Sequence, residues 1–217
     1  MNVQQRLRCD QCKRPAAACV CRWVRPIDSS VALLILQHPM EFTNAKGSAR
    51  LLHLSVGGSV MLGGEQFAPD QLKTLLYADG RRPVLLYPQL AAMEPSRAIE
   101  PILLTAPEAL RLVVLDGTWR KSRKMLYLNP LLQELPRLAL SGMPPSKYRI
   151  RKAHAPDQLS TLEAGCHALG QLEGRHERYA GLLQAFDDFT AHFQATDGRV
   201  GECARLNDGL ENRGPST

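Results

Sequence analysis

Short apolar runs alternate with helix signals along most of this chain, and this alternation constrains its fold more than any other feature. The longest run, SVALLILQ, is a continuous apolar stretch of strand length, which is typical of a strand buried on both faces of a parallel sheet. The expected strands are residues 30–37, 59–62, 83–87 and 111–115, and the expected helices are residues 44–54, 69–77, 120–128 and 175–195. The alternating order predicts an α/β domain with a mostly parallel sheet.

Composition divides the chain into three parts. Residues 1–26 contain closely spaced cysteines, residues 27–195 contain the alternating units, and residues 196–217 are polar and rich in glycine. We therefore expect a small N-terminal module, one core domain and a flexible C-terminal tail.

The charge of the chain favours an anionic partner such as nucleic acid. The net charge is +6, and no apolar run is long enough to span a membrane. The first ten residues, MNVQQRLRCD, lack the apolar core of a secretory signal. We expect a cytoplasmic protein that meets nucleic acid and no membrane.

The N-terminal cysteines predict a metal site. They form the pattern C-x2-C-x6-C-x-C with Cys9, Cys12, Cys19 and Cys21. Four thiolates this close suit tetrahedral zinc, and disulfides do not persist in a reducing cytosol. Such a closed site would be structural; free thiols are the alternative. Cys166 and Cys203 stand alone, and we expect them to be a buried small hydrophobe and a tail residue.

The segment Asp116-Gly117-Thr118-Trp119 follows an expected strand and precedes a basic stretch. Ligands of open parallel sheets bind beyond the carboxyl ends of the strands, so Asp116 is a candidate base or ligand holder and Trp119 a candidate pocket wall. Gly117 would let the backbone approach a ligand closely. In the structural alternative, Asp116 caps the next helix and Trp119 anchors the core.

Two other expected strands end in residues that could share this pocket. One is followed by Gln37-His38-Pro39 and the other ends in Leu86-Tyr87-Pro88. In a parallel sheet the ends at Gln37, Tyr87 and Asp116 could gather at one edge. His38 there would either bind a ligand or order its own loop.

Cations that could contact a phosphate backbone occur in three places. Lys46 and Arg50 share a helix face, a basic stretch follows Trp119, and alternating cations near residue 150 would share one face of an extended segment. Solvated helix faces and a charged edge strand are the alternatives. The candidate RNA-binding residues are Lys46, Arg50, Arg120, Arg123, Lys124, Lys147, Arg149 and Arg151.

Ser160 and Glu163 form the S-x-x-E pattern of a capping box before an apolar-periodic run. This explains both residues without a functional role. A capped helix start is also a good place to hold a carboxylate, so Ser160 and Thr161 remain ligand candidates.

Taken in order, these motifs resemble the DTW-domain proteins over about residues 9 to 190. The matching segments are the four cysteines, Gln37-His38-Pro39 with Glu41, residues 45–52, Leu86-Tyr87-Pro88, Asp116-Gly117-Thr118-Trp119 and residues 159–164. The resemblance implies a SPOUT-like domain, knotted around its cofactor site, behind the N-terminal zinc module.

The same resemblance implies an S-adenosylmethionine-dependent tRNA-uridine aminocarboxypropyltransferase. Such an enzyme transfers the 3-amino-3-carboxypropyl group to N3 of a variable-loop uridine and releases methylthioadenosine. Asp116 and Trp119 are then the candidate catalytic residues, with Asp116 either the base or a cofactor holder. The candidate cofactor-binding residues are Gln37, His38, Leu86, Tyr87, Pro88, Asp116, Gly117, Thr118, Ser160 and Thr161.

Two other functions fit the same residues. One is a SPOUT-like RNA methyltransferase with the same cofactor, and the other is a non-catalytic zinc-dependent RNA-binding protein. A SPOUT-type domain could be a monomer or a homodimer.

Overall fold

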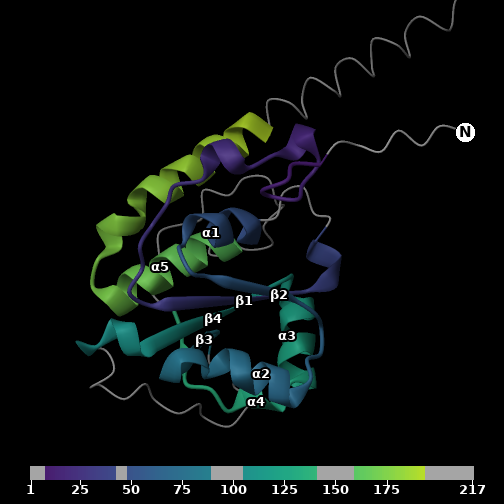
Figure 1. Cartoon of the computed structure of the whole chain (residues 1–217), viewed down its shortest axis with the longest axis vertical. Coiled ribbons are helices and arrows are strands. Elements are labelled where there is room, and N and C mark those ends of the chain that lie inside the picture. Colours follow the sequence, from purple (N-terminus) through teal and green to yellow (C-terminus); the bar gives the residue numbers. More distant parts are fainter. Residues whose placement is uncertain (1–7, 43–47, 89–104, 141–158, 194–217) are drawn as a thin grey trace, which may run out of the picture.

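The computed structural model describes residues 8–42, 48–88, 105–140 and 159–193 of the 217-residue chain (Figure 1). Within these ranges, five strands form one sheet in the order β2-β1-β4-β3-β5, and the pairings between neighbouring strands are all parallel. The strands are β1 (Ala32–Gln37), β2 (Val60–Gly63), β3 (Arg82–Leu86), β4 (Leu110–Asp116) and β5 (Arg137–Leu138).

Helices connect and cover these strands. The α-helices are α1 (Ala49–Ser55), α2 (Pro69–Leu76), α3 (Trp119–Leu128), α4 (Pro130–Gln133) and α5 (Thr161–Glu173), and residues 180–193 form one more. The 3-10 turns are η1 (Ala16–Ala18), η2 (Cys21–Trp23), η3 (Pro39–Glu41), η4 (Ala78–Gly80), η6 (Pro107–Ala109) and η7 (His176–Tyr179).

The sheet lies between two helical layers (Figure 1). The helices α1, α5 and 180–193 cover one face, and α2, α3 and α4 cover the other. Side chains alternate between the faces of a strand, so Leu33 and Ile35 join the first core while Leu34 and Leu36 join the second. Because both faces are covered, every residue of β4 is buried. This confirms the expectation of parallel strands buried on both faces.

The cysteine segment belongs to the first of these cores. Cys12 and Val20 are buried in the same cluster as residues of α1 and α5. The N-terminal segment therefore packs on the α1 and α5 face of the sheet.

The expected strands and helices are confirmed, with bounds that differ by a few residues. The strand β5 and the helix α4 were not expected. β5 has only two residues, and α4 is a single turn after α3, so neither contains enough residues to show a periodicity.

Several expectations fall beyond the described residues. The described residues do not define the predicted knot, and the predicted tail comprises residues 196–217; both stay predictions. The predicted helix of residues 44–54 is described only from Ala49 onward. Among the described residues, no helix has the length and apolar character needed to cross a membrane.

Candidate functional site

The carboxyl ends of β1, β4 and β3 lie side by side at one edge of the sheet. Gln37 is the register partner of Asp116, and the next amide, that of His38, donates to the Asp116 carbonyl oxygen at 2.9 Å. β3 flanks β4 on the other side, and Tyr87 follows its last residue. The expected convergence of Gln37, Tyr87 and Asp116 is confirmed.

Asp116 is a buried carboxylate, 5% exposed, held from two directions. Gln37 Nε2 donates to its Oδ2 at 2.8 Å, and Thr161 Oγ1 donates to its Oδ1 at 2.7 Å. Hydrogen bonds of this charge-assisted kind are short and stabilise the negative charge. Three elements, β1, β4 and α5, thus meet at one carboxylate.

Asp116 does not cap the helix that follows it. Thr118 is the N-cap of α3, and its Oγ1 accepts from the amide of Lys121 at 3.4 Å. The structural alternative is therefore wrong for Asp116. Gly117 is packed closely, because a Cβ there would lie 3.1 Å from Lys121 Cβ and 3.6 Å from His38 Cβ.

Trp119 does not anchor the core. It is the first residue of α3 and is 48% exposed. Its ring meets the buried Tyr87 edge to face, with ring centroids 5.5 Å apart. The indole is therefore half-exposed and packs on Tyr87 at the carboxyl edge of the sheet, and the alternative of a core anchor is wrong.

Ser160 and Glu163 form the expected capping box at the start of α5. Ser160 Oγ accepts from the Glu163 amide at 3.2 Å, and Glu163 Oε2 accepts from the Ser160 amide at 2.8 Å. Leu162 also donates its amide to Ser48 Oγ at the start of α1, at 3.3 Å. The box fixes the start of α5 and so aims the next hydroxyl, that of Thr161, at Asp116.

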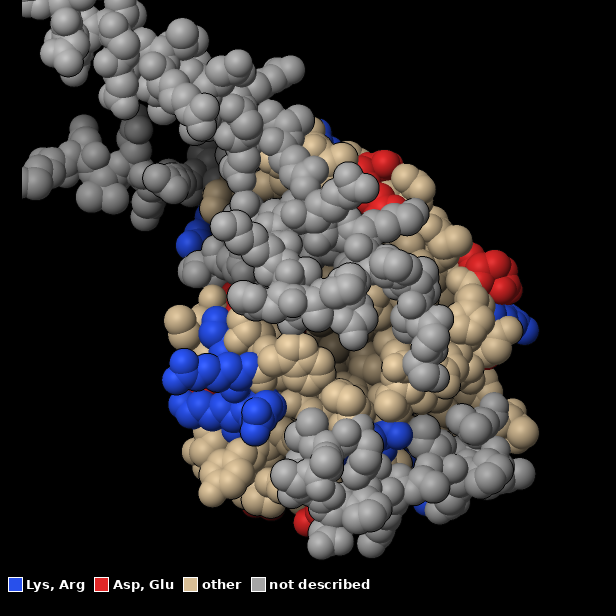
Figure 2. All heavy atoms as spheres, turned by 180° about the vertical axis from the view of Figure 1, so that it is seen from behind, with Lys and Arg blue, Asp and Glu red and all other residues tan. Residues whose placement is uncertain are grey.

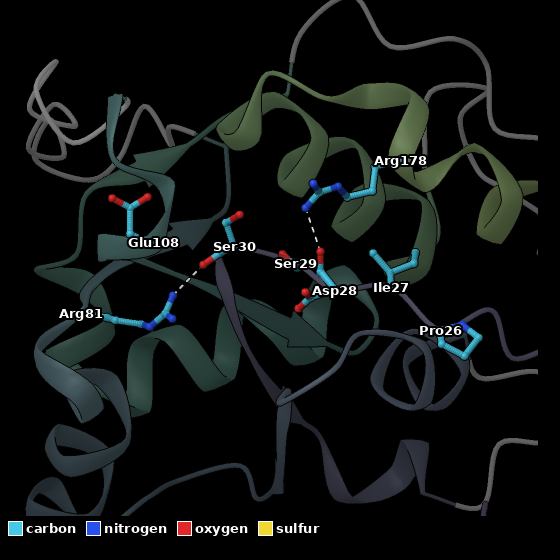
Figure 3. A pocket seen from close by; sticks show the side chains of 8 residues that line it. All are labelled: Pro26, Ile27, Asp28, Ser29, Ser30, Arg81, Glu108 and Arg178. Carbon is cyan, nitrogen blue, oxygen red and sulfur yellow. Dashed lines mark hydrogen bonds between the residues drawn. The ribbon is translucent and has the colours of Figure 1, made fainter.

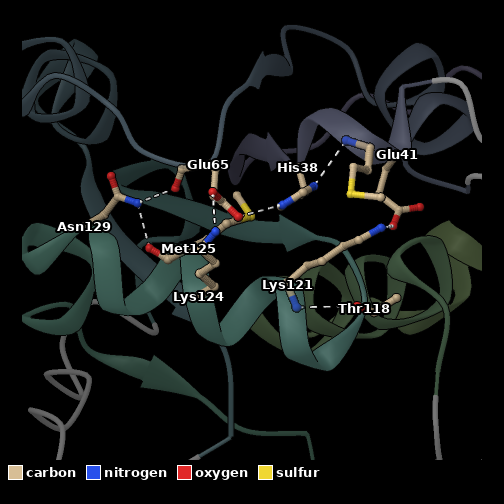
Figure 4. Close-up of polar contacts among 9 residues, drawn as sticks. His38, Glu41, Glu65, Thr118, Lys121, Lys124, Met125 and Asn129 are labelled. Carbon is tan, nitrogen blue, oxygen red and sulfur yellow. Dashed lines mark hydrogen bonds and ion pairs between the residues drawn. The ribbon is translucent and has the colours of Figure 1, made fainter.

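A network of ion pairs ties α3 to the loops after β1 and β2 (Figure 4). Lys121 Nζ lies 2.8 Å from Glu41 Oε1, and Lys124 Nζ lies 2.8 Å from Glu65 Oε2. The Lys124 ammonium, followed by the His38 ring, holds the pKa of Glu65 below its ordinary value. Sequence reasoning missed Lys121 and Glu65, because their pairing depends on strand order.

His38 orders its own loop within this network. Its Nδ1 accepts from the Met40 amide at 3.2 Å, so the neutral ring carries its proton on Nε2 and donates to Glu65 Oε1 at 2.9 Å. Of the two roles expected for His38, the loop-ordering one is confirmed.

The exposed face of α3 combines cations with aromatic rings. Lys121 and Lys124 are ion-paired, whereas Arg120 and Arg123 are exposed. Figure 2 shows Lys and Arg side chains gathered where α3 lies. Trp119, Arg123 and Tyr127 follow each other at intervals of four residues and so form one row. Tyr127 is 79% exposed, and sequence reasoning missed it although this spacing could have revealed it.

Of the remaining candidate RNA-binding cations, Arg50 alone lies within the described residues. Arg50 is half-buried on α1, near the end of β1. Lys46, Lys147, Arg149 and Arg151 lie outside the described residues.

The four cysteines meet at one point. The Sγ atoms of Cys9, Cys12, Cys19 and Cys21 all lie within 4.8 Å of one another. Cys9 Sγ is 3.6 Å from Cys21 Sγ, and Cys12 Sγ is 3.8 Å from Cys19 Sγ. A tetrahedron with Zn–S bonds of about 2.3 Å places its sulfurs about 3.8 Å apart, while a disulfide would need about 2.05 Å. The donor set fits tetrahedral zinc.

Two thiols of this cluster, those of Cys9 and Cys21, differ in their pKa. Backbone amides of Cys12 and then Gln11 lower the pKa of Cys9 to about 6. Burial, followed by hydrogen bonding to Cys9, raises the pKa of Cys21 to about 12. Elsewhere, Cys166 is 1% exposed in the first core, which confirms the expectation of a buried small hydrophobe.

A cavity of about 550 Å³ opens at the opposite edge of the sheet, before β1, β3 and β4 (Figure 3). Its two arginines bind backbone carbonyl groups of the segment before β1. Arg81 donates to the Ser30 carbonyl oxygen and Arg178 to that of Asp28, both at 2.7 Å. Their positions therefore serve the packing at this edge. We place the candidate site at the carboxyl edge, where Asp116 lies.

Comparison with known proteins identifies relatives of this chain. It is 33% identical over 179 residues to tRNA-uridine aminocarboxypropyltransferase 2 of Drosophila melanogaster, covering 80% of this chain and 69% of that protein. It is 29% identical to the proteins of the same name from Mus musculus and Macaca fascicularis, covering 79% of this chain but only 58% of each relative. No solved structure matches the chain significantly.

The sequence model of the DTW domain matches residues 6–194. The match includes the cysteine cluster, the Asp116 segment and the start of α5. The chain therefore belongs to the DTW domain family.

Proposed function

We propose that this protein is a tRNA-uridine aminocarboxypropyltransferase that uses S-adenosylmethionine. The observation that carries the proposal is the buried carboxylate of Asp116, held by Gln37 and Thr161 at the carboxyl edge of the sheet, the edge that the half-exposed Trp119 follows. The names of the three relatives support the activity, and the basic face of α3 suits an RNA substrate.

In the proposed reaction, uridine N3 attacks the chain carbon next to the sulfonium sulfur. The N3–C bond forms as the C–S bond breaks, and the electron pair of that bond stays on sulfur, which leaves as the thioether methylthioadenosine. N3 loses its proton in the same step. The proton of N3 becomes acidic as the nitrogen bonds to carbon, so a nearby carboxylate can take it.

Asp116 is the proposed proton acceptor. Its two hydrogen bonds stabilise the ionised form and fix its direction, so that the carboxylate is ready without rearrangement. Trp119, with Tyr87 behind it, would wall the side of the site where the adenosine or the uridine ring stacks. Leu86, Pro88, Gly117 and Thr118 border the same edge and are the proposed backbone contacts of the cofactor.

The row of Trp119, Arg123 and Tyr127 is the proposed contact with the RNA. Arginines would neutralise phosphates, and an exposed tyrosine offers a flat face on which an unpaired base can stack. Unpaired bases of this kind occur in RNA loops, where sequence-specific recognition is common.

We propose that the four cysteines hold a structural zinc ion. When bound, the metal would cross-link the N-terminal segment next to the site and leave no open position for catalysis. Cys12 and Val20 lie in the core under this segment, so the metal would stabilise the face that carries α1 and α5.

Mass spectrometry of tRNA nucleosides tests the proposed function. The protein is incubated with S-adenosylmethionine and unmodified tRNA, and the small-molecule product is identified alongside. A uridine carrying the aminocarboxypropyl group, with methylthioadenosine, is expected. A methylated nucleoside with S-adenosylhomocysteine would show a methyltransferase instead, and tRNA binding with no product would show a non-catalytic RNA-binding protein.

A further inference from the structure

A second, smaller cavity lies between the cysteine segment and the end of β1. It holds about 30 Å³, which is room for about two groups of the size of a water molecule. Its lining residues are Cys12, Lys13, Arg14, Gln37, Glu41, Phe42 and Arg50. Gln37 connects this cavity to the candidate site, because its Nε2 donates to Asp116.

The amide of Gln37 offers an acceptor to this cavity. A reversed amide would turn Oε1 toward the Asp116 carboxylate, so the hydrogen bond from Nε2 fixes its orientation. Gln37 is 4% exposed, and no hydrogen-bond donor of the described chain reaches its Oε1. Buried acceptors are rarely left without a donor, so this oxygen points to a ligand that carries one.

The charges around the cavity favour a ligand with a carboxylate as well. Lys13, Arg14 and Arg50 bring three cations, against the carboxylate of Glu41, which already pairs with Lys121 at 2.8 Å, and the thiolate of Cys12, which the proposed zinc ion would bind. A guanidinium can bind a carboxylate through two parallel hydrogen bonds. The cavity therefore offers partners for an ammonium and a carboxylate at adjacent positions.

We propose that this cavity binds the α-amino-carboxylate end of the transferred group, with Arg50 on the carboxylate and Gln37 Oε1 accepting from the ammonium. This inference rests on the proposed function and specifies where the protein binds the amino-acid end of its cofactor. Arg50 then binds the cofactor and not the RNA backbone. Gln37 donates to Asp116 through Nε2 and accepts from the ammonium through Oε1. It therefore fixes the position of the chain carbon next to sulfur relative to Asp116.

Two ligands that differ in the aminocarboxypropyl chain test this inference. S-adenosylmethionine carries the chain, and methylthioadenosine lacks it. Calorimetry with the full chain is expected to show that Arg50→Met and Gln37→Met each weaken S-adenosylmethionine binding about tenfold or more, the effect of losing a hydrogen bond to a charged group. Their affinity for methylthioadenosine should stay within about twofold, because this ligand lacks the group that Arg50 and Gln37 are proposed to bind.

Arg175→Met is the matched control, because Arg175 is exposed and lies after α5, away from the cavity. It should leave both affinities unchanged. Thermal melting of each variant confirms that it is folded, and Arg50→Lys, which keeps the charge, should lose less affinity than Arg50→Met.

Unchanged S-adenosylmethionine binding in both variants, or an equal loss for the two ligands, would overturn the amino-acid site while leaving the proposed function standing. Failure of the wild-type protein to bind either ligand would instead overturn the proposed function, and this inference with it.

Discussion

Replacing Asp116 by asparagine separates its charge from its structural role. The asparagine side chain has nearly the same shape, so its Oδ1 can accept from Gln37 Nε2 while its Nδ2 donates to the Thr161 hydroxyl. Gln37 and Thr161 both keep a partner, and the negative charge is lost. We expect a stability change of about 1 kcal/mol. Asp116→Ala is less informative, because it leaves the buried Gln37 amide without an acceptor, at a cost of about 1–3 kcal/mol.

The expected loss of activity is much larger. Removing a positioned general base lowers a rate by about 100-fold to 10,000-fold. The assay is the initial rate of methylthioadenosine release at saturating tRNA and S-adenosylmethionine, with the affinity for each measured separately. A rate within about threefold of wild type, with unchanged affinities, would refute the role of Asp116 as base, since general-base contributions are larger than this.

Three further predictions concern Thr161, the cysteine cluster and the row of exposed residues on α3. Thr161→Val removes one hydrogen bond from the carboxylate and should slow transfer about tenfold, whereas Thr161→Ser keeps the hydroxyl and most of the rate; equal rates in the two would contradict the positioning role. Cys12→Ser should reduce bound metal, measured by mass spectrometry, from about one zinc per chain, and a metal-free wild-type protein would disprove the site. Tyr127→Ala should weaken tRNA binding by about fivefold or more through lost stacking, while the control Tyr77→Ala, which removes another exposed tyrosine at the end of α2, should not. Arg123→Met should also lower the salt dependence of tRNA binding. Equal tRNA affinities of the two tyrosine variants would exclude the α3 row as the RNA contact.

Much of the secondary structure could be predicted because its signals are local. The run before Gln37 and the run before Asp116 are strands because they are continuously apolar, and α5 starts at Thr161 because Ser160 and Glu163 cap it. The spacing of the cysteines was enough to predict their cluster. Each of these signals spans only a few residues of chain.

The contacts of the candidate site could not be predicted in the same way. Gln37 and Asp116 are 79 residues apart, Lys121 and Glu41 are 80 apart, and Lys124 and Glu65 are 59 apart. None of these pairs leaves a periodic trace in the sequence, because the partners meet only through the strand order β2-β1-β4-β3-β5. The exposure of Trp119 also depends on this packing, since an indole after a buried strand suits a core as well as a surface.

The sequence by itself therefore determined the class of fold, the cysteine cluster and the strand end at which Asp116 stands. Only the tertiary structure decided that Thr118 caps α3, that Gln37 and Thr161 hold Asp116, and that two of the α3 cations are taken up by Glu41 and Glu65. The physical reason is that backbone periodicity and capping act within one or two turns of chain. Hydrogen bonds between side chains depend instead on which distant elements the buried cores bring together.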